Sequence, residues 1–260
     1  MRLIGRNKTK NNDKIASEWD LIAESRSEQL INHKDISMDH VLIPFIIQSM
    51  SEAVLENVID IGCGTGYATS RYGGKIKKLT GIDLSSKSIN EAKKKCENNI
   101  NFSFINSSIE TFSNTTTERF SLGIANMTLM GVVNLDQVVI SVNKVLLNDS
   151  LFVITITHPF FWPFYWGYYK ESWFSYSREI EVEGNFSISL DSSNFITTHY
   201  HRPVEMYINT LIKNDFEVLN ISEPLPSLEI QKLYPNKWEF PRFLGIICKK
   251  KIQDTLLARR

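Results

Sequence analysis

The segment at positions 58–67, Val-Ile-Asp-Ile-Gly-Cys-Gly-Thr-Gly-Tyr, constrains the fold more than any other part of the sequence. Val58–Ile61 is apolar and β-branched apart from one acid, which is typical of a short buried parallel strand. Gly62, Gly64 and Gly66 follow, and then a segment predicted to be helical. Such a turn lets the backbone approach a ligand and offers it the unpaired N–H groups of a helix start. The sequence therefore predicts a ligand site here.

The glycine spacing narrows the class of ligand. A dinucleotide-binding turn needs G-x-G-x-x-G, but Tyr67 stands at the place of its third glycine, and the Gly-Lys-Ser/Thr ending of a phosphate loop is missing. The segment instead resembles, nearly residue for residue, the first motif of the class I S-adenosylmethionine (SAM) methyltransferases. This resemblance implies SAM as the cofactor. An ordinary tight strand–helix turn is the alternative that this segment alone leaves open.

Composition excludes several other classes of protein. Lysine plus arginine equals aspartate plus glutamate at 29 each, so no net positive charge points to nucleic acid. Cys63, Cys96 and Cys248 are scattered, which argues against a disulfide scaffold or a zinc site, and no metal is expected. No apolar run approaches the roughly 20 residues of a membrane span, and the N-terminus lacks a signal-peptide core. These features predict a cytoplasmic protein without a membrane span.

Strands and helices are predicted to alternate along most of the chain. This alternation specifies a doubly wound α/β sheet, which the resemblance extends to seven strands, mostly parallel, with the last strand antiparallel between the fifth and sixth. The predicted strands are 58–61, 79–84, 101–105, 120–127, 151–156, 216–221 and 243–249. The predicted helices are one from Ile15, then 38–53, 67–73, 87–97, 134–147 and 204–214. Residues 1–14 are expected to be frayed, and residues 113–118 and 147–150 are expected to be loops, with Asn148 left-handed.

Polar residues stand at or just beyond the carboxyl ends of these strands, where such sheets bind ligands. Asp83 lies about twenty residues past the glycine loop, and its carboxylate can accept hydrogen bonds from both ribose hydroxyls. Where related families usually have an acid that receives the adenine amino group, this sequence has Ser108. The predicted cofactor-binding residues are Asp60, Gly62, Cys63, Gly64, Gly66, Asp83, Leu84, Ser107, Ser108, Ile109, Asn126 and Met127.

The chain divides into four predicted parts. Residues 1–53 are N-terminal helices that cover the cofactor and substrate, 54–158 are the SAM-binding core, 159–202 are a cap insertion, and 203–260 complete the core sheet. In methyltransferases that resemble this chain, an N-terminal helix with a Trp-Asp pair closes over the cofactor, as Trp19 would here. A core anchor is the equally weighted alternative for this tryptophan.

The insertion is unusually aromatic: eleven of the seventeen residues from 160 to 176 are Phe, Tyr or Trp. An aromatic lining would select a flat or apolar acceptor, whereas a small core of the insertion itself and a dimer contact are the alternatives. Ser177 to Ile188 is predicted to be a hairpin that turns at 183–185, with a further strand at 195–200. The predicted substrate-binding residues are Trp19, Met130, Phe161, Trp162, Tyr165 and Trp166.

An oxygen or nitrogen acceptor can need a base, and His158, His199 and His201 are the candidate catalytic residues because histidine titrates near neutral pH. His158 is preferred since it follows the fifth strand. We thus expect a SAM-dependent methyltransferase acting on O, N or C of a small aromatic or apolar metabolite, without nucleic acid and with a homodimer left open. The competing classes are an RNA methyltransferase and a non-catalytic scaffold or regulator with this fold.

Overall fold

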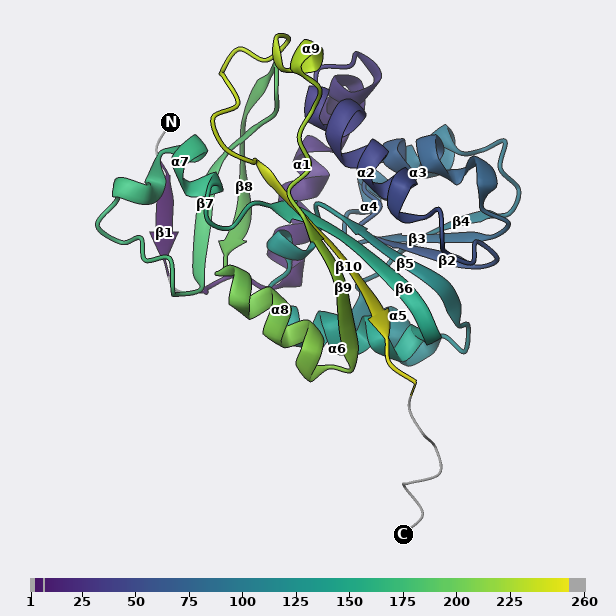
Figure 1. Cartoon of the computed structure of the whole chain (residues 1–260). Coiled ribbons are helices and arrows are strands. Elements are labelled where there is room, and N and C mark those ends of the chain that lie inside the picture. The colour runs from purple at the N-terminus through teal and green to yellow at the C-terminus, as the bar shows by residue number, and fades with distance from the viewer. Residues whose placement is uncertain (1–2, 7, 253–260) are drawn as a thin grey trace.

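A computed structural model describes residues 3–6 and 8–252 of the chain. Seven strands form one sheet in the order β4-β3-β2-β5-β6-β10-β9 (Figure 1). β10 runs antiparallel to both β6 and β9, and the other neighbouring pairs are parallel. This confirms the predicted doubly wound sheet with its last strand antiparallel. The strands are β2 (Val58–Ile61), β3 (Leu79–Asp83), β4 (Phe102–Asn106), β5 (Phe120–Asn126), β6 (Leu146–Thr157), β9 (Phe216–Ser222) and β10 (Phe243–Lys250).

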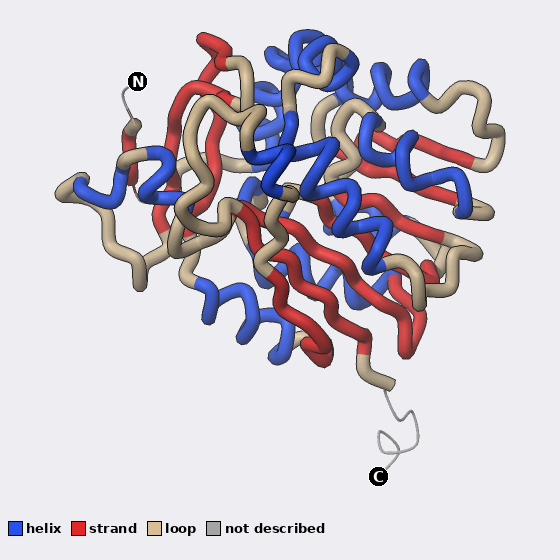
Figure 2. The backbone as a smooth tube through the Cα atoms, turned by 45° about the horizontal axis from the view of Figure 1, so that its top comes forward, coloured by secondary structure: helices blue, strands red, loops and turns tan. Residues whose placement is uncertain are grey.

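Helices cover both faces of the sheet (Figure 2). They bury its apolar residues in two core clusters. One core cluster joins the sheet to α2 (Ile43–Ser49), α3 (Tyr67–Tyr72) and α4 (Ser86–Lys95). The other core cluster joins it to α5 (Ile109–Thr115), α6 (Leu135–Val145) and α8 (Val204–Lys213). α1 (Asn12–Ile31) and the π-helical turn Met38–Leu42 precede them, and short 3-10 turns lie at Gly73–Lys75 and Leu129–Gly131.

A second, smaller sheet lies beside the carboxyl ends of the parallel strands. It has the order β1-β7-β8, with β1 (Ile4–Arg6), β7 (Ile180–Ser187) and β8 (Ser192–His201) all antiparallel. α7 (Trp162–Trp166) and the 3-10 turn Tyr168–Lys170 belong to the same aromatic insertion, and α9 (Leu228–Gln231) lies between β9 and β10.

The N-terminal segment differs from its prediction as a frayed end. Ile4 pairs with Glu183 and Gly5 with Val182, so β1 forms an edge of the cap sheet. The prediction also placed a hairpin turn at 183–185, whereas β7 continues through these residues and pairs Gly184 with Thr197. β8 pairs with residues 183–185 and β1 pairs with Glu183 on the other edge, and this pairing outweighs the turn propensity of Glu-Gly-Asn. The chain reverses after Ile188, whose N–H donates to the Asp191 carbonyl oxygen at 2.9 Å.

Two predicted loops are also partly wrong. Residues 113–115 complete α5 instead of a loop, because Ser113 and Thr115 hydroxyls donate to carbonyl oxygens of the preceding helical turn. β6 begins at Leu146, and the left-handed residue in its first part is Asp149, with φ of 65°, rather than Asn148. Aspartate and asparagine both tolerate this conformation, so the sequence does not distinguish them.

Gly66→Ala is expected to destabilise the protein by about 2–4 kcal/mol, through backbone strain and overpacking. Gly66 has a φ of +73°, and an added Cβ would lie 2.9 Å from the Cα and Cβ of Ala92 in α4. Gly74→Ala is the control, since its Cβ would meet nothing within 4 Å. Urea unfolding of the two variants measures the difference. Equal stabilities would show that the close approach of α3 to α4 does not require Gly66.

Candidate cofactor and acceptor site

The glycine loop between β2 and α3 leaves open space for a ligand. Gly62, Gly64 and Gly66 all have positive φ, at 70°, 54° and 73°. A Cβ on Gly64 would meet no atom within 4 Å, and Gly64 lines a cavity of about 200 Å³. The hydroxyl of Thr65, on the same cavity, is buried and has no hydrogen-bond partner among the described residues. The loop thus offers a ligand open space at Gly64 and a hydroxyl group, that of Thr65, which has no hydrogen-bond partner in the described chain.

Asp83 lies at the tip of β3, directly across from this loop. One carboxylate oxygen accepts a hydrogen bond from Gly64 N at 2.9 Å and the other accepts one from Ser85 N at 2.8 Å. Burial raises the pKa of Asp83 to about 6, although the two backbone N–H groups oppose the shift. Because each carboxylate oxygen has a further lone pair, Asp83 can accept additional hydrogen bonds from a hydroxylated ligand in the cavity.

All the predicted cofactor-binding residues except two line this first cavity. The residues that line it as predicted are Gly62, Cys63, Gly64, Asp83, Leu84, Ser107, Ser108, Ile109, Asn126 and Met127. Asp60 and Gly66 do not. Asp60 is turned toward α3, where it accepts hydrogen bonds from Thr69 and Tyr72, and burial raises its pKa. Neither residue lines the cavity. Asp60 holds α3 through its two hydrogen bonds, and Gly66 allows α3 to lie close to Ala92 of α4.

Helix α1 closes the first cavity with one of its faces. The lining residues on this face recur at three- and four-residue spacing: Asn12, Ile15, Trp19, Ala23, Arg26 and Leu30. The next residue after Trp19, Asp20, accepts hydrogen bonds from the Ser85 hydroxyl at 2.6 Å and from Lys87 N at 3.0 Å, at the start of α4. The two residues of the Trp-Asp pair thus have different roles. Trp19 lines the cavity, and Asp20 holds α1 against the start of α4.

The Ser108 side chain makes a hydrogen bond within its own segment. Its hydroxyl oxygen accepts a hydrogen bond from Thr111 N at 3.1 Å and caps α5. The carboxylate that lines the cavity in this region is Glu110, two residues further on. Sequence reasoning missed Glu110 because it looked for an acid only at position 108.

A second cavity, of about 270 Å³, lies between the core and the aromatic insertion. Of the predicted substrate-binding residues, Trp19, Met130, Trp162, Tyr165 and Trp166 line it, and Phe161 does not. The Phe161 ring instead stacks on Phe240, with centroids 4.9 Å apart and planes at 3°. Part of the insertion thus lines a cavity and Phe161 packs against the loop before β10, while Tyr168, Ile180 and Val182 form a small buried cluster within the insertion.

The two cavities share part of their lining. The residues common to both are Trp19, Arg26, Met38, Met127 and Gly131. Met127 has a left-handed backbone, with φ of 55°, and its N–H donates to Thr155 O at 2.9 Å and to Thr155 Oγ1 at 3.1 Å. Such a conformation costs a non-glycine residue of order 1 kcal/mol and persists only where the surroundings hold it. The strained residue therefore marks the junction of the cavities.

The three candidate histidines lie in different surroundings. His158 lines neither cavity: one ring nitrogen is 2.9 Å from Glu223 and the other accepts the N–H groups of residues 160 and 161. His201 also lines neither, and its ring contacts the Tyr176 carbonyl at 3.0 Å. His199 lines the second cavity, and burial lowers its pKa to about 3, so the ring is neutral at pH 7. The structure does not bring His158 or His201 to the site.

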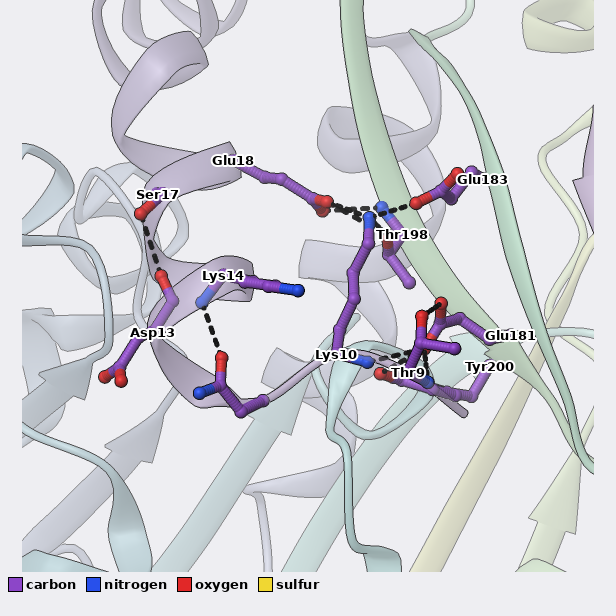
Figure 3. A network of polar contacts seen from close by, with 11 residues as sticks. Thr9, Lys10, Asp13, Lys14, Ser17, Glu18, Glu181, Glu183, Thr198 and Tyr200 are labelled. Carbon is purple, nitrogen blue, oxygen red and sulfur yellow. Dashed lines mark hydrogen bonds and ion pairs between the residues drawn. The ribbon is translucent and has the colours of Figure 1, made fainter. Parts of the chain in front are cut away.

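The N-terminal segment joins α1 to the cap sheet. Thr9 donates from its N–H and its hydroxyl to the Glu181 carboxylate, at 2.8 Å each (Figure 3). Lys10 pairs with Glu18 of α1 and, at 2.5 Å, with Glu183 of β7 (Figure 3). These contacts join α1, which lines both cavities, to the cap sheet, which lines the second.

The comparisons agree with this geometry. Residues 53–161 match the family model of a methyltransferase domain, and no curated protein matches the sequence. A protein from Listeria monocytogenes described as a SAM-dependent methyltransferase is 24% identical, with a TM-score of 0.62, covering 81% of this chain and 98% of that one. A SAM-dependent methyltransferase from Clostridium acetobutylicum is 17% identical, with a TM-score of 0.61, covering 88% and 98%.

A third solved structure contains ligands. It is the Burkholderia thailandensis 1,6-didemethyltoxoflavin-N1-methyltransferase with that compound and S-adenosylhomocysteine bound; it is 12% identical, with a TM-score of 0.60, covering 95% of this chain and 93% of that one. Residues 53–161 therefore match a methyltransferase domain, and the whole described fold is that of solved SAM-dependent methyltransferases. The open space at Gly64, the Thr65 hydroxyl without a partner in the described chain and the Asp83 carboxylate fit SAM, the cofactor named for these solved structures.

Within residues 3–6 and 8–252, no helix is long and apolar enough to cross a membrane. Over the same described residues, no group of three or more His, Cys, Asp or Glu side chains could hold a metal ion.

Proposed function

We propose that the protein transfers a methyl group from SAM in the first cavity to an O, N or C atom of a small, aromatic or apolar metabolite in the second. The shared lining of the two cavities at Trp19, Met38 and Met127 carries this proposal. The Burkholderia neighbour, an N1-methyltransferase solved with 1,6-didemethyltoxoflavin and S-adenosylhomocysteine bound, supports it. We also propose that residues 1–53 and 159–202 act as covers over a core of 54–158 and 203–260.

In this proposal the chain mainly positions the reactants. SAM supplies the methyl group and its own leaving group, so the protein gains rate chiefly by alignment and by excluding water. Asp83 would accept the ribose hydroxyls, Gly62 and Gly64 would admit the methionine end close to their backbone, and Glu110 would face the adenine. Since the His199 ring is a weak base, the acceptor would have to give up any proton without a strong base from the chain.

The affinity for S-adenosylhomocysteine is expected to fall as the pH drops below about 6. Burial raises the pKa of Asp83 to about 6, and only the ionised carboxylate is a charged acceptor for two hydroxyls. Binding should therefore be constant from pH 7 to 8 and weaken by up to about tenfold per unit below pH 6. Calorimetry across this range checks it, and Asp83→Asn should flatten the profile. A profile that persists in Asp83→Asn would assign the titration to another group.

Trp166→Ala is expected to lower kcat/KM for the acceptor at least tenfold, while the dissociation constant of S-adenosylhomocysteine stays unchanged. Trp166 lines the second cavity only, and removing its ring takes away roughly 2 kcal/mol of apolar contact. The control is Tyr169→Ala, an exposed aromatic of the same insertion that lines neither cavity.

The assay supplies methyl-labelled SAM and a collection of small aromatic compounds, and it follows label in the organic product. An accepted compound whose turnover depends on Trp166 but not on Tyr169 supports the proposal. Equal losses in both variants would place the acceptor outside the second cavity.

A further inference from the structure

The second cavity contains two arginines that differ in how their charge is balanced. Arg26 pairs with Asp35, with Nη2 and Oδ2 2.6 Å apart. Arg242 has no carboxylate within 4.0 Å among residues 3–6 and 8–252. The only other ionisable groups on the lining are His199, which is neutral, and the Tyr165 phenol. Among the described lining residues, the charge of Arg26 is balanced by Asp35. The charge of Arg242 is not balanced, so the lining carries one net positive charge.

The Arg242 side chain is held rigidly, and yet it keeps a donor unused. Nη2 donates to Asn236 O at 2.9 Å, and the guanidinium carbon lies 4.5 Å from the ring centres of Tyr165 and of Trp238. The Tyr234 ring is 5.0 Å away. In contrast, Nε is buried and has no hydrogen-bond partner within the described part of the chain. Because Nε has almost no accessible surface, a ligand in the cavity would meet the guanidinium through its other nitrogen atoms.

A planar carboxylate is the group that such an arginine recognises best. The guanidinium fork matches two carboxylate oxygens, and a charge-assisted hydrogen bond is about twice as strong as a neutral one. The remaining lining near Arg242 is apolar and aromatic, including Trp162, Trp166 and Phe243. The cavity thus combines a flat apolar wall with one fixed cation.

We propose that the acceptor is an aromatic carboxylate whose acid group binds Arg242. This inference rests on the proposed function and specifies its substrate class. Arg242 lines the second cavity alone, whereas Met127 and Trp19 line both. In this proposal the carboxylate is held by a residue that the cofactor cavity does not share, and the atom that receives the methyl group lies toward the shared residues.

The test compares paired ligands on the intact protein saturated with S-adenosylhomocysteine. Each pair is a monocyclic or bicyclic aromatic carboxylate, such as benzoate or 2-naphthoate, and the carboxamide of the same ring, which keeps the shape and removes the charge. Calorimetry or thermal shift gives the affinity ratio in wild type, in Arg242→Met and in Arg242→Lys. Arg119→Met is the matched control, since Arg119 also donates to backbone carbonyls of its own loop but is exposed and far from both cavities.

We expect at least one carboxylate to bind tenfold or more tightly than its carboxamide in wild type and in Arg119→Met. This preference should disappear in Arg242→Met and return in part in Arg242→Lys, with S-adenosylhomocysteine affinity unchanged. Equal or tighter binding of the carboxamides, no binding by any pair, or a preference that survives Arg242→Met would overturn the inference. Failure to bind S-adenosylhomocysteine at all would instead contradict the proposed function. If Arg242→Met does not fold, the wild-type ratio alone still decides the charge preference.

Discussion

Replacing Asp83 with alanine is expected to weaken binding of S-adenosylhomocysteine by about 100-fold or more, or about 2.7 kcal/mol, because each hydrogen bond to a charged group is worth about 1.5–3 kcal/mol. The carboxylate sits at the tip of β3 and already orders the loop through Gly64 N and Ser85 N. The substitution therefore removes both the ligand's hydroxyl acceptor and one support of the glycine loop. Isothermal calorimetry measures the loss.

Two comparisons separate these contributions. Asp83→Asn keeps the volume and an acceptor oxygen, so we expect a smaller loss than in the alanine variant. Glu97→Ala removes an exposed acid just beyond α4 and should bind like wild type. A dissociation constant for Asp83→Ala within threefold of wild type would rule out Asp83 as a ribose-binding residue.

Arg202→Met is expected to reduce the free energy of unfolding by about 3–5 kcal/mol, the range for breaking a buried charge pair. The Arg202 side chain is fully buried, and its Nε donates to Glu179 at 2.5 Å. Its other nitrogens donate to the carbonyl oxygens of Leu129 at 2.9 Å and Val132 at 2.6 Å. Arg202 thus ties the end of β8 to the loop at 128–133, part of which lines both cavities.

Urea unfolding measures this loss, and Arg178→Met, an exposed arginine of the same cap, is its control. A double variant that also carries Glu179→Met should recover part of the stability, because it no longer leaves a partly buried carboxylate without its partner. A loss of less than 1 kcal/mol in the single variant would show that the cap and the core loop are joined mainly by other contacts.

Most of the sheet could be predicted because its signals are local. Short, mostly apolar runs such as Val58–Ile61 identify buried strands, and their alternation with helices indicates a doubly wound sheet. The glycine loop and Asp83 are part of this pattern. The antiparallel last strand was expected only from the resemblance to a known family.

The rest of the site depends on contacts between distant segments. Arg26 lies seven residues after Trp19, so helical spacing could have placed it on the same face of α1. Arg242 offered no such signal, because its environment comes from α7 and from the loop before β10. His158 follows the fifth core strand, as predicted. Its ring does not point into either cavity but toward Glu223, just after β9. Sequence neighbours do not specify which way a side chain points after a strand ends.

Calorimetric titration of the wild-type protein with S-adenosylhomocysteine, alongside NAD, decides whether the first cavity is a SAM site. We predict micromolar binding of S-adenosylhomocysteine and none of NAD, because Asp83 and the glycine loop are present while Tyr67 replaces the glycine of a dinucleotide turn. Tighter binding of NAD, or no binding of S-adenosylhomocysteine at millimolar concentration, would contradict the identification of this cavity as a cofactor site for methyl transfer.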